Sequence, residues 1–393
     1  MRGVWNRRFA PRALAAVTAA FALAACGSGD AEDRDPGEAG DPSAQQRTET
    51  TEGARRMLVG PQCEAGERTV VAPPEQGLYH GAMPSLLHDD LSRSRSAARV
   101  RSFEKLAGKE LALVYFSDNW FRGIRFPAEA VESVRRAGAV PFIRLMPRSG
   151  WEEGRADPKY PLRRIAAGAF DEDLRRWARA ARDTRLPMLV DFAPEMNGDW
   201  FPWSGIHNGG ARSGPQTYRD AFRHIVDVFR EEGADNVGFA LHVNVRSAPA
   251  EPWNDLGQYY PGDDYVDWIG VSAYGGVFPG YDWEPLRRAL DEAYPKLTAM
   301  SATKPIAVLE TGVIEEEGKD KAAWIRSAYR ALRSGRYPRV KAAIWWHERW
   351  VNDDDRVSDV RIDSGKEATA AYRSAVRGAS FVDRPRYACA PKA

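Results

Sequence analysis

Eight short apolar runs recur along this chain of 393 residues, and each is followed by a longer segment with helical patterning. Continuous apolar runs of four to eight residues are typical of strands in a parallel sheet, which is buried on both faces. The runs lie at residues 77–79, 111–116, 140–145, 188–192, 237–241, 268–272, 306–309 and 342–346. Eight strand-then-helix units predict an α/β fold, and specifically a (β/α)8 TIM barrel.

Proline and glycine mark the ends of several helices between these strands. We expect helices from Pro127 to Gly138, from Pro215 to Gly233, from Pro285 to Met300 and from Lys321 to Ser334. Proline suits the first turn of a helix, where its missing N–H has no partner to lose, and glycine suits the residue just past the end.

The first 56 residues have the composition of a targeting signal and a stalk. Several arginines precede an apolar stretch at residues 13–22, and Leu23-Ala-Ala-Cys26 follows. This pattern resembles the lipobox of bacterial lipoproteins. The resemblance implies cleavage after residue 25, lipid on Cys26, and an extracytoplasmic protein anchored to the bacterial cell membrane; an ordinary secretory signal is the alternative. Residues 26–56 are polar and predict a flexible, disordered linker.

Residues 57–393 contain no linker-like interruption, so we expect one domain. We also expect a monomer. The formal net charge of +1 gives no general attraction to nucleic acid and favours a neutral substrate. Cys63 and Cys389 lie near the two ends of this domain, where they form either a disulfide or two free thiols. Neither cysteines nor histidines show zinc-ligand spacing, so we expect no metal and no cofactor.

Two of the expected strands lead into a glutamate, Glu195 and Glu310. Catalytic groups of a barrel come from the C-terminal ends of its strands. Glycoside cleavage requires two carboxyl groups, because one protonates the departing sugar oxygen while the other attacks the anomeric carbon or stabilises its charge. The pair therefore indicates a glycosidase. Alternatively, Asn197-Gly198 is a turn and Glu195 a surface carboxylate beside it.

Three segments, in this order, resemble glycoside hydrolase family 26, which is known mainly for β-mannanases. They are EMNGDWFPW at residues 195–203, YYPGDDYVDWIGVSAY at 259–274 and KPIAVLETG at 304–312. The family is part of a clan of retaining (β/α)8 glycosidases with the acid/base on the fourth strand and the nucleophile on the seventh. The resemblance covers about residues 77–372.

The resemblance implies that Glu195 is the general acid/base, that Glu310 is the nucleophile, and that Tyr274 orients the nucleophile. One departure is Pro194, since the family usually has histidine before the acid/base. A barrel mouth rich in aromatic rings also suits sugars, whose C–H faces stack on them. The residues that we expect to contact substrate are Trp200, Trp203, Tyr274, Trp345, Trp346, Asn197 and His80.

These observations predict a retaining endo-glycosidase that hydrolyses a β-linked neutral polysaccharide through a glycosyl-enzyme intermediate. β-1,4-Mannan is the first expectation, and β-1,3- or mixed-linkage glucan is the alternative. A non-catalytic glycan-binding surface lipoprotein is the competing class, with Pro194 as its main support. For the enzyme, we expect Tyr274 to favour an ionised Glu310, and the negative charge of Glu310 to raise the pKa of Glu195.

Overall fold

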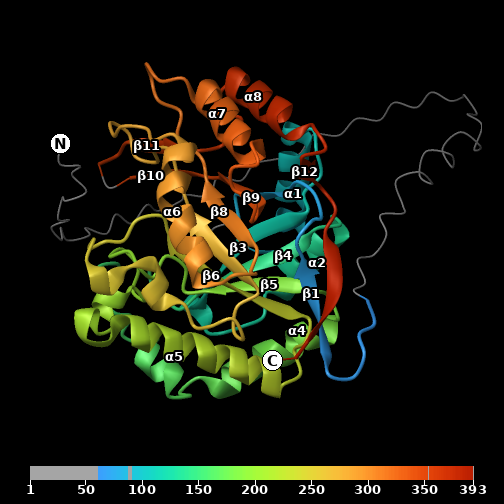
Figure 1. The fold of residues 1–393 in the computed structure, drawn as a ribbon, viewed down its shortest axis with the longest axis vertical. Helices are drawn as coiled ribbons and strands as arrows, with labels where there is room; N and C mark the ends of the chain where they lie inside the picture. The colour runs from blue at the N-terminus through green and yellow to red at the C-terminus, as the bar shows by residue number, and fades with distance from the viewer. Residues whose placement is uncertain (1–60, 87–90, 353, 393) are drawn as a thin grey trace, which may run out of the picture. The chain divides into compact units, whose positions relative to one another are not determined.

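The structure is a computed structural model that describes residues 61–86, 91–352 and 354–392. Figure 1 shows its course from blue to red. The expected signal peptide at residues 1–25, the lipidated Cys26 and the linker at residues 26–56 lie outside the described residues. None of the helices in the described part of the chain is long and apolar enough to cross a membrane.

Eight parallel strands form a closed barrel, which confirms the predicted fold. They are β2 (Leu78–Pro84), β3 (Leu113–Asn119), β4 (Val140–Met146), β5 (Met188–Phe192), β6 (Val237–Asn244), β7 (Trp268–Ser272), β8 (Ile306–Thr311) and β9 (Val340–His347). Each strand pairs with the next, and β2 also pairs with β9, from Tyr79 opposite Ala342 to Pro84 opposite His347. That last pairing closes the sheet, so β5 and β8 are the fourth and seventh barrel strands.

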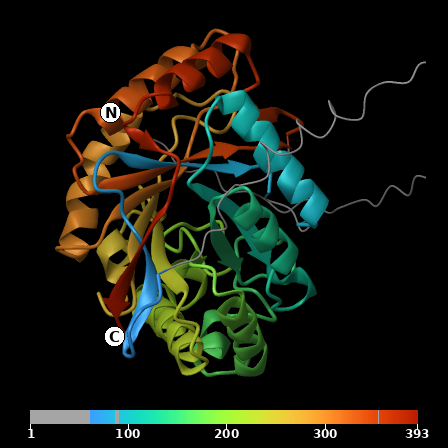
Figure 2. The same ribbon diagram turned by 90° about the vertical axis from the view of Figure 1, so that its right-hand side faces the viewer.

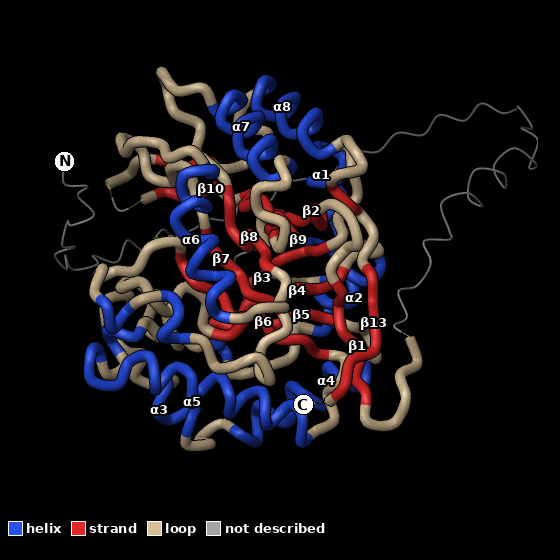
Figure 3. Tube along the Cα trace, viewed as in Figure 1, coloured by secondary structure: helices blue, strands red, loops and turns tan. Residues whose placement is uncertain are grey.

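Helices surround the strands, as Figure 3 shows in blue around red. They are α1 (Arg93–Ala107), α2 (Ala128–Arg136), α3 (Leu162–Ala166), α4 (Asp171–Thr184), α5 (Gly210–Glu231), α6 (Leu286–Met300), α7 (Lys321–Arg333) and α8 (Lys366–Val376). The expected start of α5 is wrong, because the helix begins at Gly210 and Pro215 lies inside it. Gly214 packs so closely on Gly205 that a Cβ there would lie 2.4 Å from the Gly205 carbonyl oxygen.

Several short strands and 3-10 turns accompany the eight barrel strands. A hairpin of β10 (Arg349–Val351) and β11 (Val357–Asp359) follows β9, and β12 (Phe381–Val382) adds to β2. Four 3-10 turns lie at Trp120–Arg122, Gly205–His207, Pro252–Asn254 and Leu256–Tyr259. The hairpin and the first two turns follow the C-terminal ends of β9, β3 and β5, so they lengthen the loops at the mouth of the barrel.

The opposite end of the barrel carries an antiparallel pair, β1 (Glu67–Ala72) and β13 (Arg386–Pro391). Figure 2 shows these two segments, blue and red, side by side. The amide of Thr69 donates to the carbonyl of Asp235, which precedes β6, and the indole of Trp268, at the start of β7, donates to the carbonyl of Val71. This two-stranded sheet, here called the basal sheet, therefore covers the N-terminal ends of the barrel strands.

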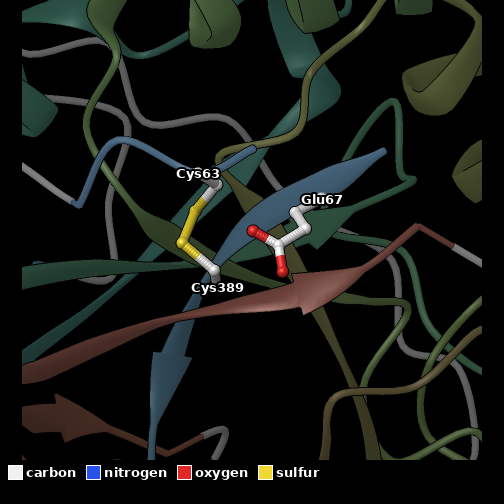
Figure 4. Close-up of side chains that lie close together, drawn as sticks. All are labelled: Cys63, Glu67 and Cys389. Carbon is white, nitrogen blue, oxygen red and sulfur yellow. A yellow bond between two sulfur atoms is a disulfide. The ribbon is translucent and has the colours of Figure 1, made fainter. Parts of the chain in front are cut away.

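A disulfide joins Cys63 and Cys389 beside the basal sheet, with Cα atoms 5.4 Å apart (Figure 4). Glu67 lies next to the two sulfur atoms, and these three side chains are the only cluster of metal-ligand type among the described residues. Because both sulfurs are bonded to each other, neither offers the thiolate that a metal site requires.

Candidate active site

Glu195 lies in a tight turn just past the C-terminal end of β5. Its amide donates to the carbonyl of His242 in β6 at 2.7 Å, and the amide of Gly198 donates back to its carbonyl at 2.9 Å. Ala193 and Glu195 both have left-handed backbones, with φ of 52° and 55°. Such conformations cost on the order of 1–3 kcal/mol for residues other than glycine and are concentrated at functional sites. The turn is therefore held in place by its neighbours.

Two neutral donors hold the carboxyl group of Glu195. The indole of Trp200 donates to Oε2 at 2.9 Å, and the amide of Asn244 in β6 donates to Oε1 at 3.0 Å. Trp200 reaches this position because Gly198 has no side chain, since a Cβ there would lie 2.5 Å from the indole ring. The carboxyl group is thus oriented by neutral hydrogen bonds, and Glu195 as a whole is only 6% exposed.

Glu310, near the end of β8, lies in a charged environment. Its Oε2 accepts a hydrogen bond of 2.8 Å from the hydroxyl of Tyr274, and its Oε1 lies 3.1 Å from a guanidinium nitrogen of Arg144 in β4. Burial raises the pKa of Glu310, the charge of Arg144 lowers it, and the negative charge of Glu195 raises it, with a net increase. The hydrogen bond from Tyr274 acts in the expected direction and lowers this pKa, but burial outweighs it.

Arg144 was not among the residues predicted from the sequence. It is buried between the rings of Trp346 and Tyr115, at 5.0 and 5.6 Å from their centres, and donates to Ser117 at 3.0 Å. Burial acts to lower the pKa of Arg144, but Glu310 and other acidic neighbours raise it above its ordinary value. The side chain is therefore a permanent cation beside Glu310. In the sequence, Arg144 is marked only as the one charged residue in the otherwise apolar run of residues 140–146.

Three of the seven expected substrate-contacting residues lie around the two carboxyl groups. Trp200 and Tyr274 bond to them directly, and Trp346 packs edge-on against Tyr274 at 6.5 Å while facing Arg144. They come from the segments that follow β5 and β7 and from β9.

Trp345 and His80 require correction, because both face away from the barrel interior. Trp345 is fully buried between Tyr329 of α7 and Tyr372 of α8, at ring distances of 6.3 and 5.4 Å. His80 is bonded to the carbonyl of Glu110 at 2.7 Å and to the Tyr372 hydroxyl at 3.0 Å. Successive residues of a strand point to opposite faces, so Trp345 cannot share the site with Trp346.

Trp203 and Asn197 also require correction, because both are buried beneath the turn. The indole of Trp203 donates to the carbonyl of Pro194 at 2.7 Å. The side chain of Asn197 accepts from the amide of Asn244 at 2.8 Å and donates to its carbonyl at 2.9 Å. Both residues thus fix the backbone that carries Glu195 and its partner Asn244, with no surface left for a sugar.

Exposed aromatic rings extend the mouth beyond the carboxyl groups. Trp151 follows β4 and is 52% exposed, and Phe278 and Tyr281 follow β7 and are 40% and 47% exposed. Loops that follow barrel strands gather at the end where Glu195 and Glu310 lie. These rings therefore offer apolar faces on the same end of the molecule, as a polysaccharide substrate requires.

A closed (β/α)8 barrel with two buried carboxyl groups, one just past its fourth strand and one near the end of its seventh, provides the pair of groups that glycoside cleavage requires. Residues 167–346 match the model of Glycosyl hydrolase family 26. The fold and this match make the chain similar to the (β/α)8 glycosidases of family 26.

Relatives of known name agree with this class. "Endoglucanase H" of Acetivibrio thermocellus is 32% identical over 288 residues, which is 72% of this chain and 29% of that protein. "Mannan endo-1,4-beta-mannosidase A and B" of Caldalkalibacillus mannanilyticus is 26% identical over 172 residues, 43% of this chain and 30% of that protein. The chain thus spans less than a third of the length of either relative.

A solved structure of the Bacillus subtilis mannanase man26 superposes with a TM-score of 0.52 at 19% sequence identity, over 79% of this chain and 88% of that one. At this identity the likeness concerns the fold alone.

Proposed function

We propose that the protein is a retaining endo-glycosidase that hydrolyses β-linked neutral polysaccharide, with Glu310 as nucleophile and Glu195 as general acid/base. The observation that carries the proposal is the unequal environment of the two buried carboxyl groups. Glu310 is paired with the cation Arg144, which favours the ionised form, whereas Glu195 is held by the neutral donors Trp200 and Asn244. Such an arrangement suits one carboxylate that attacks and one carboxyl that exchanges a proton.

The reaction has two steps. In the first, Glu310 attacks the anomeric carbon while Glu195 donates its proton to the leaving oxygen, so that the glycosidic bond breaks and a glycosyl ester forms on Glu310. In the second, Glu195 removes a proton from water, whose oxygen attacks the anomeric carbon and releases Glu310. Arg144 and Tyr274 stabilise the carboxylate that is consumed in the first step and regenerated in the second.

β-1,4-Mannan remains the first candidate substrate, supported by the family resemblance and by the name of the Caldalkalibacillus relative. A β-linked glucan is the second, supported by the name of the Acetivibrio relative, which matches more of this chain. The two sugars differ in the orientation of one hydroxyl group, which the walls of the site must distinguish.

The test is release of reducing ends from mannan, β-1,3-glucan, mixed-linkage glucan and xylan by the purified protein. Retention predicts that proton NMR of the first product shows the β-anomer before mutarotation. Release of the α-anomer would assign an inverting mechanism. Binding to one of these glycans, without reducing ends and without product from an aryl glycoside, would instead identify a non-catalytic glycan-binding protein.

We also propose that Cys26 carries a lipid that anchors the protein to the outer side of the bacterial cytoplasmic membrane. The support is the Leu23-Ala-Ala-Cys26 sequence after an arginine-rich start. Expression in a bacterial host should place the protein in the detergent phase of a phase-partition assay, and Cys26→Ser should move it to the aqueous phase. Aqueous partitioning of the unmodified protein would refute the anchor.

A further inference from the structure

A buried chain of polar side chains lies inside the barrel, and the mechanism above does not use it. Asp191 of β5, His242 of β6 and Ser272 of β7 are all completely buried. Nδ1 of His242 lies 2.7 Å from Asp191 Oδ2, and its Nε2 lies 2.7 Å from Ser272 Oγ. The imidazole therefore connects three neighbouring strands of the barrel.

The hydrogen bonds of His242 place a hydrogen on Nδ1. They allow Nε2 to be either bare or protonated. The hydroxyl of Tyr115 donates to Asp191, so its oxygen, 3.0 Å from Nδ1 of His242, is available as an acceptor. Both neighbours of Nδ1 then accept, and Nδ1 carries a hydrogen. Nε2 faces a serine hydroxyl, which donates to a bare nitrogen or accepts from a protonated one. His242 can thus gain a proton when the Ser272 hydroxyl rotates, without further movement.

His242 is also connected to both proposed catalytic residues. Its carbonyl accepts the amide of Glu195 at 2.7 Å. Its side-chain partner Ser272 lies opposite Glu310 in the pairing of β7 with β8, and the next amide, that of Ala273, donates to the carbonyl of Glu310 at 2.8 Å. A single residue therefore contacts the backbone of the acid/base directly and that of the nucleophile through one neighbouring strand.

Acidic groups outnumber cations around His242. The ionisable groups that face this region are Asp191 of β5, Tyr115 of β3, Arg144 of β4, Glu310 of β8, and Glu195 and Tyr274 at the mouth. Asp191, Glu310 and Glu195 are three buried carboxyl groups against one buried cation, Arg144. Because an uncompensated buried charge is costly, a second cation is favoured there.

Two other buried histidines provide a contrast. Burial lowers the pKa of His80 and of His347 to about 4, so both are neutral in mildly acidic solution. His80 bonds to a carbonyl and a tyrosine hydroxyl, and His347 lies 3.8 Å from the exposed Asp363. His242 differs in its direct bond to a fully buried carboxylate.

We propose that His242 is a positioning residue whose imidazolium, held between Asp191 and Ser272, balances the buried carboxylates and keeps Glu310 ionised for attack. This role rests on the proposed function for its catalytic consequence, but the charge state is measurable without activity. A positive charge at His242 also lowers the pKa of Glu310.

The first test measures the charge by NMR of protein labelled with ¹⁵N-histidine, at about pH 5.5, below the ordinary histidine pKa of about 6.5. Both ring nitrogens of His242 should carry a hydrogen, whereas His80 and His347 should each keep one bare nitrogen. Ser272→Ala, which perturbs only the Nε2 partner, assigns the signal. A bare nitrogen on His242 at this pH would overturn the proposal, whether or not the protein hydrolyses any glycan.

The second test compares the pH dependence of kcat/KM for His242→Gln and His224→Gln. His224 is the matched control, because it also bonds to an aspartate, Asp171 at 2.6 Å, but on the outer helices. In His242→Gln the acidic limb should move to higher pH, with a loss of more than about tenfold at acidic pH that shrinks as pH rises. His224→Gln should leave the profile unchanged. An equal loss at every pH would show a structural role only and refute the proposal.

Discussion

Arg144 and Glu310 form an ion pair of 3.1 Å across the interior of the barrel, between strands β4 and β8, which are not neighbours in the sheet. Only 2% of the arginine side chain and 5% of the glutamate side chain are exposed. Water therefore screens the pair little, and the ionisation of the proposed nucleophile depends on a residue from the opposite side of the barrel.

Replacing the cation tests this dependence. In Arg144→Met, Glu310 loses its counter-charge while remaining buried, so its pKa should rise further above the ordinary 4.5. A nucleophile with a higher pKa is protonated over a wider acidic range, and the acidic limb of kcat/KM should move to higher pH. An uncompensated buried charge should also cost about 3–5 kcal/mol of unfolding free energy. An unchanged acidic limb would contradict the assigned role of Arg144.

The unfolding free energy of the unmodified protein should depend on pH because the folded state raises the pKa of Glu310. Because the folded state raises the pKa of Glu310, it binds this proton more tightly than the unfolded chain does. The contribution of Glu310 to the unfolding free energy is therefore greatest below the ordinary pKa of 4.5 and falls as pH rises through the folded-state value. Glu310→Gln should remove this contribution, as measured by denaturant unfolding at several pH values. Identical pH dependence in both proteins would contradict it.

Tyr274→Phe should keep the fold and weaken the nucleophile. The variant loses the 2.8 Å hydrogen bond to Glu310 and retains Arg144. A hydrogen bond to a charged group contributes about 1.5–3 kcal/mol, so kcat/KM should fall by roughly 10- to 100-fold. Tyr337→Phe is the control, because that hydroxyl bonds to Asp291 on α6 at 2.7 Å, outside the site. Equal effects of the two variants would remove Tyr274 from the mechanism.

Glu310→Ala and Glu195→Ala should lose activity on different sets of substrates. Without Glu310 no glycosyl-enzyme forms, so activity should be lost on every substrate. Without Glu195, polysaccharide cleavage should fall by about 10²- to 10⁴-fold, but an aryl glycoside whose leaving group needs no proton should still give a burst of product. Added azide should then restore turnover in Glu195→Ala by attacking the intermediate. Azide rescue in Glu310→Ala alone would reverse the two assignments.

Trp345→Ala and Trp346→Ala should separate stability from binding, although the residues are adjacent. Trp345 packs on α7 and α8, so its loss should cost about 3–5 kcal/mol of unfolding free energy and leave KM unchanged below the melting temperature. Trp346 faces Arg144 and Tyr274, so its loss should raise KM or lower kcat. Kinetics and denaturant unfolding of both variants check this. The reverse result would place Trp345 in the site.

The eight barrel strands could be predicted because each is buried on both faces and so reads as an uninterrupted apolar run. Because both faces are buried, the sequence does not show whether a side chain points into the barrel or out toward the helices. His80, Trp345 and Trp346 all lie on strands, yet only Trp346 faces the site. With no polar alternation to reveal the inner face, sequence reasoning could not separate them.

The sequence also did not indicate which residues would contact the carboxyl groups of the two glutamates. Arg144 and Asn244 lie on strands far along the chain from the residues that they hold, and only closure of the barrel brings them together. The pairing of β1 with β13 joins segments near the two ends of the described chain, and neither has a neighbouring turn that would indicate a hairpin. By contrast, Glu195 and Glu310 could be found because each lies close to the C-terminal end of a strand.

The disulfide beside the basal sheet determines how the barrel responds to tension. Cys389 lies within β13, opposite Thr69 of β1, whereas Cys63 precedes β1. A pull on the chain from the N-terminal side of Cys63 therefore reaches β13 through a covalent bond, and β1 cannot be peeled away one hydrogen bond at a time. The disulfide lies at the base of the barrel, and the carboxyl groups of Glu195 and Glu310 lie at its mouth. A pull between a polymer held at the mouth and the chain before Cys63 would thus act along the barrel axis, and the S–S bond would carry part of that force directly to β13.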